Sequence, residues 1–344
     1  MAAALPLFVA APARAGTYDV VACHVDGAQA TNLAWTREPY NSAGKAAPAL
    51  ANFVVNGSDP VKCAPAVGAQ FSTAGAKRSV KVDDGAAWTF RAPAGTIVRR
   101  VQIWRHGTAR ASTDDPNTAH VENGWWNVVA RAGDGPGGRV VLSGEICSGA
   151  LPAPTYCATG GAFAAGSSVT LDIGEPVVAW GVQCAGTAIT SWCFTGDGTT
   201  FHARFDLQAA RVTVEDLVAP ELAPDLPAGG ARRPGDPIAA SATDSAGIRS
   251  LRVLVDGVER FTDRQDCDYR RPAPCSTSAA HTYDLSGVAD GLHTITTVAE
   301  DAATNLTRLD RTVVVDSTPP VIDRVPVKGR TISASVADAT SGVA

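Results

Sequence analysis

The last residues of the chain repeat an arrangement that occurs once before. Asp338-Ala339-Thr340-Ser341-Gly342-Val343 echoes Asp244-Ser245-Ala246-Gly247-Ile248, and Asp316-Ser317-Thr318-Pro319-Pro320-Val321 echoes Asp216-Leu217-Val218-Ala219-Pro220-Glu221. The copies lie about 95 to 100 residues apart, which is the length of one antiparallel β-sandwich module. A second module is therefore expected to begin near Val315 and to stop before its core closes, as in a piece of a longer tandem array.

Composition favours strands over helices. Val, Thr and Ala are frequent and are interrupted by Gly, Asp and Pro, and no window of a dozen residues has a convincing helical period. The chain of 344 residues has room for two or three domains. Its net charge of −5 gives no basic footprint, which argues against nucleic acid as a partner. We expect an all-β protein.

Four segments follow from these patterns. Residues 1–15 read as an export signal, because an apolar stretch precedes the small-x-small site Ala13-Arg14-Ala15. Residues 16–216 predict a β-sandwich of jelly-roll size, with strands around 96–104, 126–130, 177–182 and 201–207. Residues 217–316 predict a second β-sandwich and 317–344 the start of a third. No other stretch approaches the ~18 apolar residues of a membrane span.

Eight cysteines in an exported chain predict disulfides. Cys267 and Cys275 lie in the second sandwich and pair if the domains do not cross-link. Six others precede residue 200, and six cysteines allow 15 pairings. Proximity alone favours the pairs Cys147–Cys157, Cys184–Cys193 and Cys23–Cys63.

The second sandwich resembles a known kind of repeat. It contains Asp290-Gly291, then His293-Thr294-Ile295, then Ala299-Glu300-Asp301-Ala302-Ala303-Thr304-Asn305, and it closes on Val315-Asp316-Ser317-Thr318-Pro319-Pro320. This resembles the Ig-like repeats of bacterial, actinobacterial-type secreted and cell-surface proteins, over roughly Val218 to Ala344. The resemblance implies spacer or adhesive modules outside the cell. Thr304 departs from it, because such repeats often have Gly before the Asn. Residues 16–216 are only loosely similar to lectin-like sandwiches.

All seven tryptophans lie in the first sandwich. An indole ring can stack on the C–H face of a sugar. Trp88, Trp104 and Trp180 lie within strand patterns and are predicted to be core. Trp35, Trp126 and Trp192 are the candidate ligand-binding residues, although packing is an open alternative for each.

No catalytic motif emerges from the carboxylates or nucleophiles. The glutamates before Glu215 are Glu38, Glu122, Glu145 and Glu175, and none has a spacing that would pair two carboxyls on one strand face. Asp114 and Asp115, followed by His120 and Glu122, form the densest polar cluster and are weak candidates for Ca²⁺. A solvated loop is the simpler interpretation, so we expect no cofactor and leave calcium open. Turn aspartates such as Asp244, Asp301 and Asp338 are a further calcium alternative between modules.

The favoured interpretation is a secreted or cell-surface protein without catalytic residues. The first sandwich would bind a carbohydrate or another surface ligand, and the Ig-like modules would act as a spacer. One alternative is an extracellular glycoside hydrolase with a β-sandwich catalytic domain. Another is a purely structural spacer, for which the first sandwich would have no groove.

Overall fold

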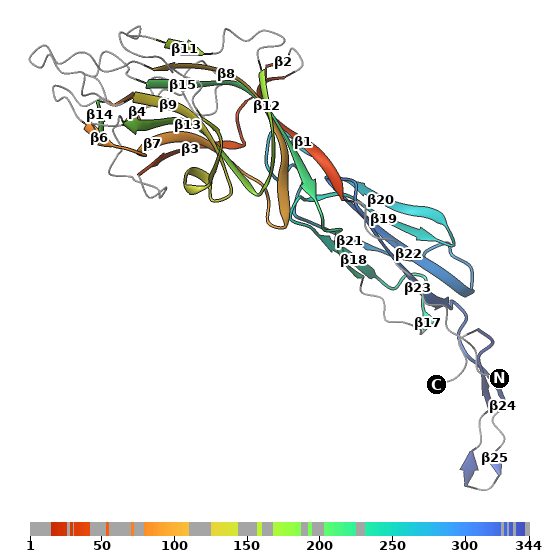
Figure 1. Cartoon of the computed structure of the whole chain (residues 1–344). Coiled ribbons are helices and arrows are strands. Elements are labelled where there is room, and N and C mark those ends of the chain that lie inside the picture. The colour runs from red at the N-terminus through yellow and green to blue at the C-terminus, as the bar shows by residue number, and fades with distance from the viewer. Residues whose placement is uncertain are drawn as a thin grey trace, which may run out of the picture. The chain divides into compact units, whose positions relative to one another are not determined.

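The computed structural model describes residues 15–25, 28–29, 31–41, 53–54, 70–71, 79–109, 125–143, 157–159, 168–186, 192–194, 203–224, 231–324, 327–328, 330–332 and 335–340. These residues form sheets that are antiparallel except where β17 (Ala231–Arg232) runs parallel to β23 (Leu306–Val315) (Figure 1), and the predicted all-β fold is confirmed. No helix among them is both long and apolar enough to cross a membrane.

The chain divides into two compact units. The N-terminal unit comprises residues 17–216 together with 268–274. The C-terminal unit comprises the described residues of 217–267 and 275–344, together with Ala15 and Gly16. The N-terminal unit is therefore completed by seven residues from much later in the sequence. The domain limits expected from the sequence stay a prediction.

The N-terminal unit contains two large sheets. The six-stranded sheet has the order β11-β8-β15-β1-β2, with β12 also paired to β8. Its strands are β1 (Gly16–Val25), β2 (Ala28–Gln29), β8 (Thr96–Ala109), β11 (Cys157–Thr159), β12 (Ser168–Glu175) and β15 (Ala203–Asp216). The five-stranded sheet has the order β10-β9-β13-β7-β3. Its strands are β3 (Trp35–Tyr40), β7 (Gly85–Arg91), β9 (Trp125–Ala132), β10 (Arg139–Ser143) and β13 (Val177–Gly186).

Smaller elements accompany these sheets. They are the paired strands β4 (Phe53–Val54) and β5 (Gln70–Phe71), the paired strands β6 (Ser79–Lys81) and β14 (Trp192–Phe194), and the 3₁₀ turn η2 (Gly135–Gly137).

The core of this unit follows from strand alternation. Trp180 and Phe90 in the five-stranded sheet and Ile103 in the six-stranded sheet are fully buried. Each buried side chain of this size contributes about 1.5–3 kcal/mol of hydrophobic free energy. Trp88 is also buried, as predicted, whereas Trp104 is half-buried.

The C-terminal unit contains a complete sandwich of three and five strands. The first sheet has the order β16-β18-β21 and the second the order β17-β23-β22-β19-β20. The strands are β16 (Glu221–Pro224), β17 (Ala231–Arg232), β18 (Ile238–Thr243), β19 (Ile248–Val255), β20 (Val258–Arg264), β21 (Ser278–Tyr283), β22 (Gly291–Asp301) and β23 (Leu306–Val315).

The patterns read from the sequence explain this sandwich. Leu251, Val253 and Val255 alternate along β19 and are buried, as their period of two predicts. Asp256 and Gly257 both have positive φ, 50° and 80°, as a two-residue hairpin turn requires. The predicted Asp-Gly hairpin between β19 and β20 is therefore confirmed.

The repeat seen in the sequence recurs in the strand pairing. In the complete sandwich Glu221 pairs with Thr243 and Leu222 with Ala242. In the next segment β24 (Val321–Arg324) pairs with β27 (Ser335–Ala337), with Ile322 opposite Val336. A further short hairpin joins β25 (Val327–Lys328) to β26 (Thr331–Ile332). Ile322 is 63% exposed, whereas its counterpart Leu222 packs against the core.

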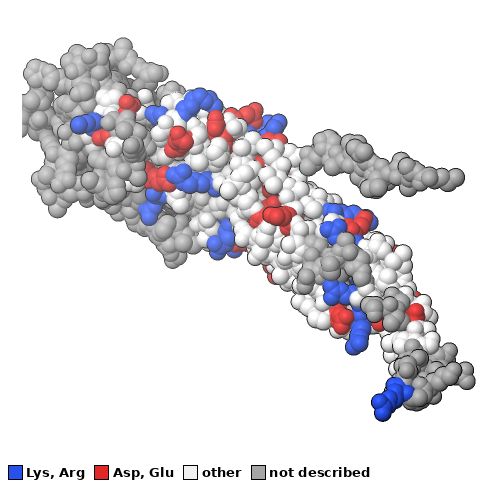
Figure 2. All heavy atoms as spheres, turned by 90° about the horizontal axis from the view of Figure 1, so that it is seen from below, with Lys and Arg blue, Asp and Glu red and all other residues white. Residues whose placement is uncertain are grey.

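Surface charges of both signs are mixed. On the face shown in Figure 2, basic and acidic side chains lie beside one another instead of in separate fields. Ion pairs such as Arg91–Glu38 (2.8 Å) and Arg100–Asp172 (2.9 Å) join residues on neighbouring strands. Pairs this exposed contribute about 0–1 kcal/mol each, so they affect solubility and specificity more than stability.

Candidate functional site

Two of the three candidate tryptophans lie on strands that meet at one end of the five-stranded sheet. Trp126 on β9 pairs with Cys184 on β13, and Trp192 on β14 pairs with Lys81 on β6. The turn between β6 and β7 is tied to the same part of β13, because the Asp83 amide donates to the Cys184 carbonyl (2.8 Å). The fold therefore brings Trp126 and Trp192 to the same sheet end, although they are far apart in the sequence.

A polar cluster occupies this sheet end, and we call Asp83, Arg131 and Gln183 the end cluster. The Arg131 Nη2 donates to Gln183 Oε1 (2.8 Å), and its Nη1 donates to the Gly138 carbonyl (2.9 Å). The Gln183 amide in turn donates to the Asp83 carboxylate. Asp83 is an exposed residue with φ of 71°, and the bond from Gln183 holds its carboxylate in place.

Tyr40 lies beneath this cluster. Its hydroxyl donates to the Val182 carbonyl (3.3 Å), and burial raises the pKa of Tyr40 further than the nearby Arg131 lowers it. The phenol is therefore protonated at neutral pH. Gly85 makes room for it, because a Cβ there would clash with the Tyr40 hydroxyl oxygen.

Trp35 lies elsewhere. It pairs with Phe90 at the opposite end of β7, is 4% exposed, and its ring centroid lies 5.7 Å from that of Phe90. Its indole ring packs in the core, which leaves Trp126 and Trp192 as the candidates for contact with a ligand.

Other predicted residues fall outside the described residues. These are the weak calcium candidates Asp114, Asp115 and Glu122 and the cysteines Cys63 and Cys147. Cys157 and Cys193 are placed only through their strands β11 and β14. Cys23 and Cys184 are disulfide-bonded. The pairings proposed for the first six cysteines stay predictions.

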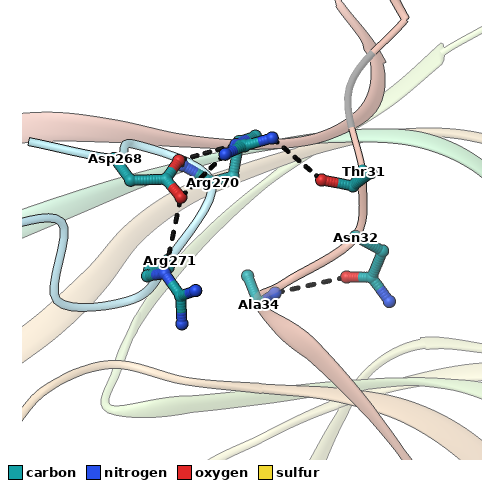
Figure 3. A network of polar contacts seen from close by, with 6 residues as sticks. All are labelled: Thr31, Asn32, Ala34, Asp268, Arg270 and Arg271. Carbon is teal, nitrogen blue, oxygen red and sulfur yellow. Dashed lines mark hydrogen bonds and ion pairs between the residues drawn. The ribbon is translucent and has the colours of Figure 1, made fainter. Parts of the chain in front are cut away.

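The Cys267–Cys275 disulfide is confirmed. It closes the segment 268–274, whose contacts lie in the N-terminal unit (Figure 3). Arg270 forms an ion pair with Asp268 (2.6 Å) and donates to Thr31 Oγ1 (3.1 Å). Its guanidinium also lowers the pKa of Asp268. We call residues 268–274 the closed loop.

The closed loop is held by backbone and ring contacts as well. The Val21 amide donates to the Tyr269 carbonyl (2.9 Å), and the Tyr18 hydroxyl donates to the Pro272 carbonyl (2.7 Å). The Tyr18 and Tyr269 rings meet edge to face, with centroids 6.3 Å apart. Strand β1 therefore gains a partner that no local sequence pattern indicates.

Two turn carboxylates of the C-terminal unit approach each other. Asp244 and Asp301 place carboxylate oxygens within 4.8 Å. Carboxylates are ligands that Ca²⁺ takes, but the ion needs six to eight oxygens. Each also serves its own turn: Asp244 accepts from the Ala246 amide (2.7 Å) and Asp301 from the Asn305 amide (2.8 Å). The pair could contribute to a metal site and does not make one by itself.

His293 joins two turns of the C-terminal unit. Its Nδ1 lies 2.6 Å from Asp256 Oδ2 and its Nε2 lies 2.8 Å from the Ala289 carbonyl. Both neighbours are acceptors, so the imidazolium is favoured. The hydrogen bond to Asp256 raises the pKa of His293, and the same bond lowers the pKa of Asp256.

This pair predicts a pH-dependent stability. A raised histidine pKa stabilises the fold fully below the unfolded value near 6.5, and this contribution is lost as pH rises through the folded pKa. The Asp256 contribution is present above 3.8 and is lost as pH falls below it. We expect His293→Gln to lower the urea midpoint more at about pH 5.5 than at about pH 9. Equal losses at both pH values would contradict the charged pair.

Comparisons with known proteins give only distant likenesses. No protein-family model matches the chain, and no curated protein matches it. Fibronectin(III)-like modules of CbhA from Clostridium thermocellum match with 20% identity over 28% of this chain and 95% of that chain, with a TM-score of 0.20.

Two larger bacterial structures also match. Dimeric latent PorU from Porphyromonas gingivalis has 11% identity over 86% of this chain and 26% of that chain, with a TM-score of 0.24. The M60 catalytic domain with the CBM51-1 and CBM51-2 domains of Clostridium perfringens ZmpB has 11% identity over 93% of this chain and 29% of that chain, with a TM-score of 0.23. At these TM-scores the likenesses carry no argument about function.

Proposed function

We propose that the protein binds a carbohydrate without catalysis, at the sheet end that carries Trp126, Trp192 and the end cluster. The supporting observation is that the strand register brings the backbone positions of Trp126 and Trp192 to the same end of the sheet as Gln183 and the turn between β6 and β7. Sugar sites combine a flat apolar surface with a few fixed polar groups. This sheet end has residue types for both parts.

Each polar group has a defined task in this proposal. Asp83 supplies an exposed carboxylate that accepts hydrogen bonds from sugar hydroxyls. Gln183 and Arg131 hold that carboxylate in position through the bonds described above. A positioned acceptor loses little conformational entropy when a ligand binds, which favours affinity.

The C-terminal unit acts as a spacer in the same proposal. Its sandwich of three and five strands and the repeated pairing of β24 with β27 fit a tandem array of Ig-like modules. The Cys267–Cys275 disulfide fits an oxidising compartment. We therefore propose a secreted protein, exported by residues 1–15 and attached to or acting at a cell surface.

A glycan array probed with the full chain tests this function. We expect binding to one or more saccharides, and a loss on the order of 10-fold for Trp126→Ala or Trp192→Ala when the hit is titrated. Trp126→Phe and Trp192→Phe are the matched controls, because they keep an aromatic face. Asp83→Asn should also weaken binding, since the amide is a poorer acceptor than the carboxylate.

The thermal unfolding of each variant is measured alongside. Variants that keep the wild-type midpoint and lose binding support the site. An array without any signal, or a saccharide hit that both Ala variants bind as well as wild type, would refute the proposal.

A further inference from the structure

We propose that a cleft beside β17 binds an acidic saccharide of the uronate class through Arg232 and Arg233. The cleft has a volume of about 700 Å³ and lies within the C-terminal unit. Its walls come from the segment 231–236, from the linker 316–320 and from Asp338. We call it the β17 cleft.

The walls of the β17 cleft are fixed by hydrogen bonds. The Asp316 amide donates to the Arg232 carbonyl (2.9 Å), which joins the two walls. Asp290 also contacts the linker: it accepts from the Ser317 hydroxyl (2.7 Å), from the Thr318 hydroxyl (2.7 Å) and from the Ser317 amide (2.8 Å). These bonds, the one from the Ser317 hydroxyl first, lower the pKa of Asp290. A cleft held in this way is preformed, as ligand sites usually are.

The aspartates of the cleft already have structural tasks. Asp236 Oδ2 accepts from the Arg233 amide (3.0 Å), and Asp316 Oδ1 accepts from the Thr318 amide (2.9 Å). These bonds are typical of aspartates that stabilise their own turns. The other carboxylate oxygen of each, Asp236 Oδ1 and Asp316 Oδ2, takes no part in these two bonds.

The arginines have no such task. Within the described part of the chain, the guanidinium groups of Arg232 and Arg233 make no hydrogen bond or ion pair, even though carboxylates line the same cleft. Arg232 is half-buried and Arg233 is exposed. The cleft therefore presents donors and acceptors that are held apart from each other.

The ligand that complements this arrangement has a carboxylate and several hydroxyls. A carboxylate can take two parallel hydrogen bonds from one guanidinium. Hydroxyls can donate to the second oxygens of Asp236 and Asp316. A compact anion of high charge would be repelled by the three aspartates of the cleft, whereas a uronate carries one charge per sugar ring. Pro234, Pro319 and Pro320 add apolar surface for ring carbons.

This inference is independent of the proposed function. It uses different residues in a different unit, so variants of Trp126 and Trp192 should leave it unchanged. Conversely, variants of Arg232 and Arg233 should leave binding at the N-terminal sheet end unchanged. Failure of either proposal is therefore recognisable by itself.

Calorimetric titration of the full chain with trigalacturonate tests the inference. We expect saturable binding that weakens as salt increases, and a loss of ~10-fold or more for the double variant Arg232→Ala/Arg233→Ala. The matched control is Arg260→Ala/Arg264→Ala, which removes the same charge from exposed positions on β20. Both double variants should fold, because the hydrogen bonds of Arg232 and Arg233 are made by backbone atoms that alanine keeps, and the thermal unfolding midpoint of each variant checks this.

Two further probes identify the chemistry. The methyl ester of trigalacturonate has the same hydroxyls without charge and should bind at least ~10-fold more weakly. Hexaglutamate carries carboxylates without sugar hydroxyls and should not compete. No binding of trigalacturonate, equal losses in the two double variants, equal binding of the ester, or binding of hexaglutamate instead would each overturn the inference.

Discussion

Replacing Cys267 and Cys275 by serine is expected to release the closed loop from strand β1. The disulfide spans a sequence separation of 8, and closing a loop of this size restricts the open chain by about 2–3 kcal/mol in the entropic model. Without it, the segment 268–274 must be ordered by its own contacts. We therefore expect the Val21 amide, which donates to Tyr269, to exchange with solvent deuterium on the order of 30-fold faster.

The measurement is native-state hydrogen exchange of the full chain. Serine substitution is more selective than a reductant, because Cys23 and Cys184 are also disulfide-bonded. Tyr269→Ala serves as a second variant: it removes the ring contact with Tyr18 but keeps the disulfide, and should have a smaller effect. The amide of Val212, buried in β15, reports whether the whole unit has opened. If Val21 stayed as protected as in wild type, the disulfide would not be what orders the loop.

The place of the closed loop in the N-terminal unit could not be predicted from the sequence. Residues 268–274 lie between two cysteines of the second sandwich and contain Asp, Arg and Pro, as many exposed loops do. Nothing in that composition indicates that Tyr269 and Pro272 complete the N-terminal unit. Such contacts join distant segments, and only the fold reveals them.

Local features were predictable because local forces cause them. The alternation of Leu251, Val253 and Val255 and the Asp256-Gly257 turn follow from strand period and backbone sterics, so they could be read directly. The irregularity at Thr304 could also be anticipated, and its φ is 70°. By contrast, the sequence left open whether Trp35 contacts a ligand or packs in the core, and it lies in β3 and packs on Phe90.

The end cluster was missed for the same reason as the closed loop. Asp83, Arg131 and Gln183 come from a turn and two strands, and each alone resembles an ordinary surface residue. A polar Gln183 within the otherwise apolar run of β13 was the one available signal. The register between β9, β13 and β7 determines that these residues meet, and no local pattern in any one of these strands predicts it.

Replacing Asn305 by alanine is expected to destabilise the C-terminal unit by about 2–4 kcal/mol. Asn305 is buried, with 7% of its surface exposed. Its Nδ2 donates to Asp301 Oδ2 (2.7 Å) and to the Val218 carbonyl (3.3 Å), and its Oδ1 accepts from the Gly16 amide (2.9 Å). Alanine would remove all three bonds, and one of them serves a carboxylate that is fully buried. The measurement is the urea midpoint and slope of the full chain, followed by a probe in this unit.

Two neighbouring variants make the result specific to these bonds. Thr304→Gly changes the preceding residue, whose φ of 70° is costly for a β-branched side chain, and should stabilise the unit by up to about 1 kcal/mol. Asn305→Asp keeps the shape but replaces the donor with a second carboxylate beside Asp301. Its loss should exceed that of alanine at neutral pH and shrink in acid, where carboxylates are protonated. If Asn305→Ala were neutral while Asn305→Asp destabilised strongly, charge repulsion would explain the motif, and the hydrogen bonds to Val218 and Gly16 would contribute little to stability. We therefore expect the Asp-x-x-x-Asn spacing to stabilise the unit in two ways. The asparagine donates a hydrogen bond to the buried Asp301, and it also bonds the backbone of Val218 and Gly16.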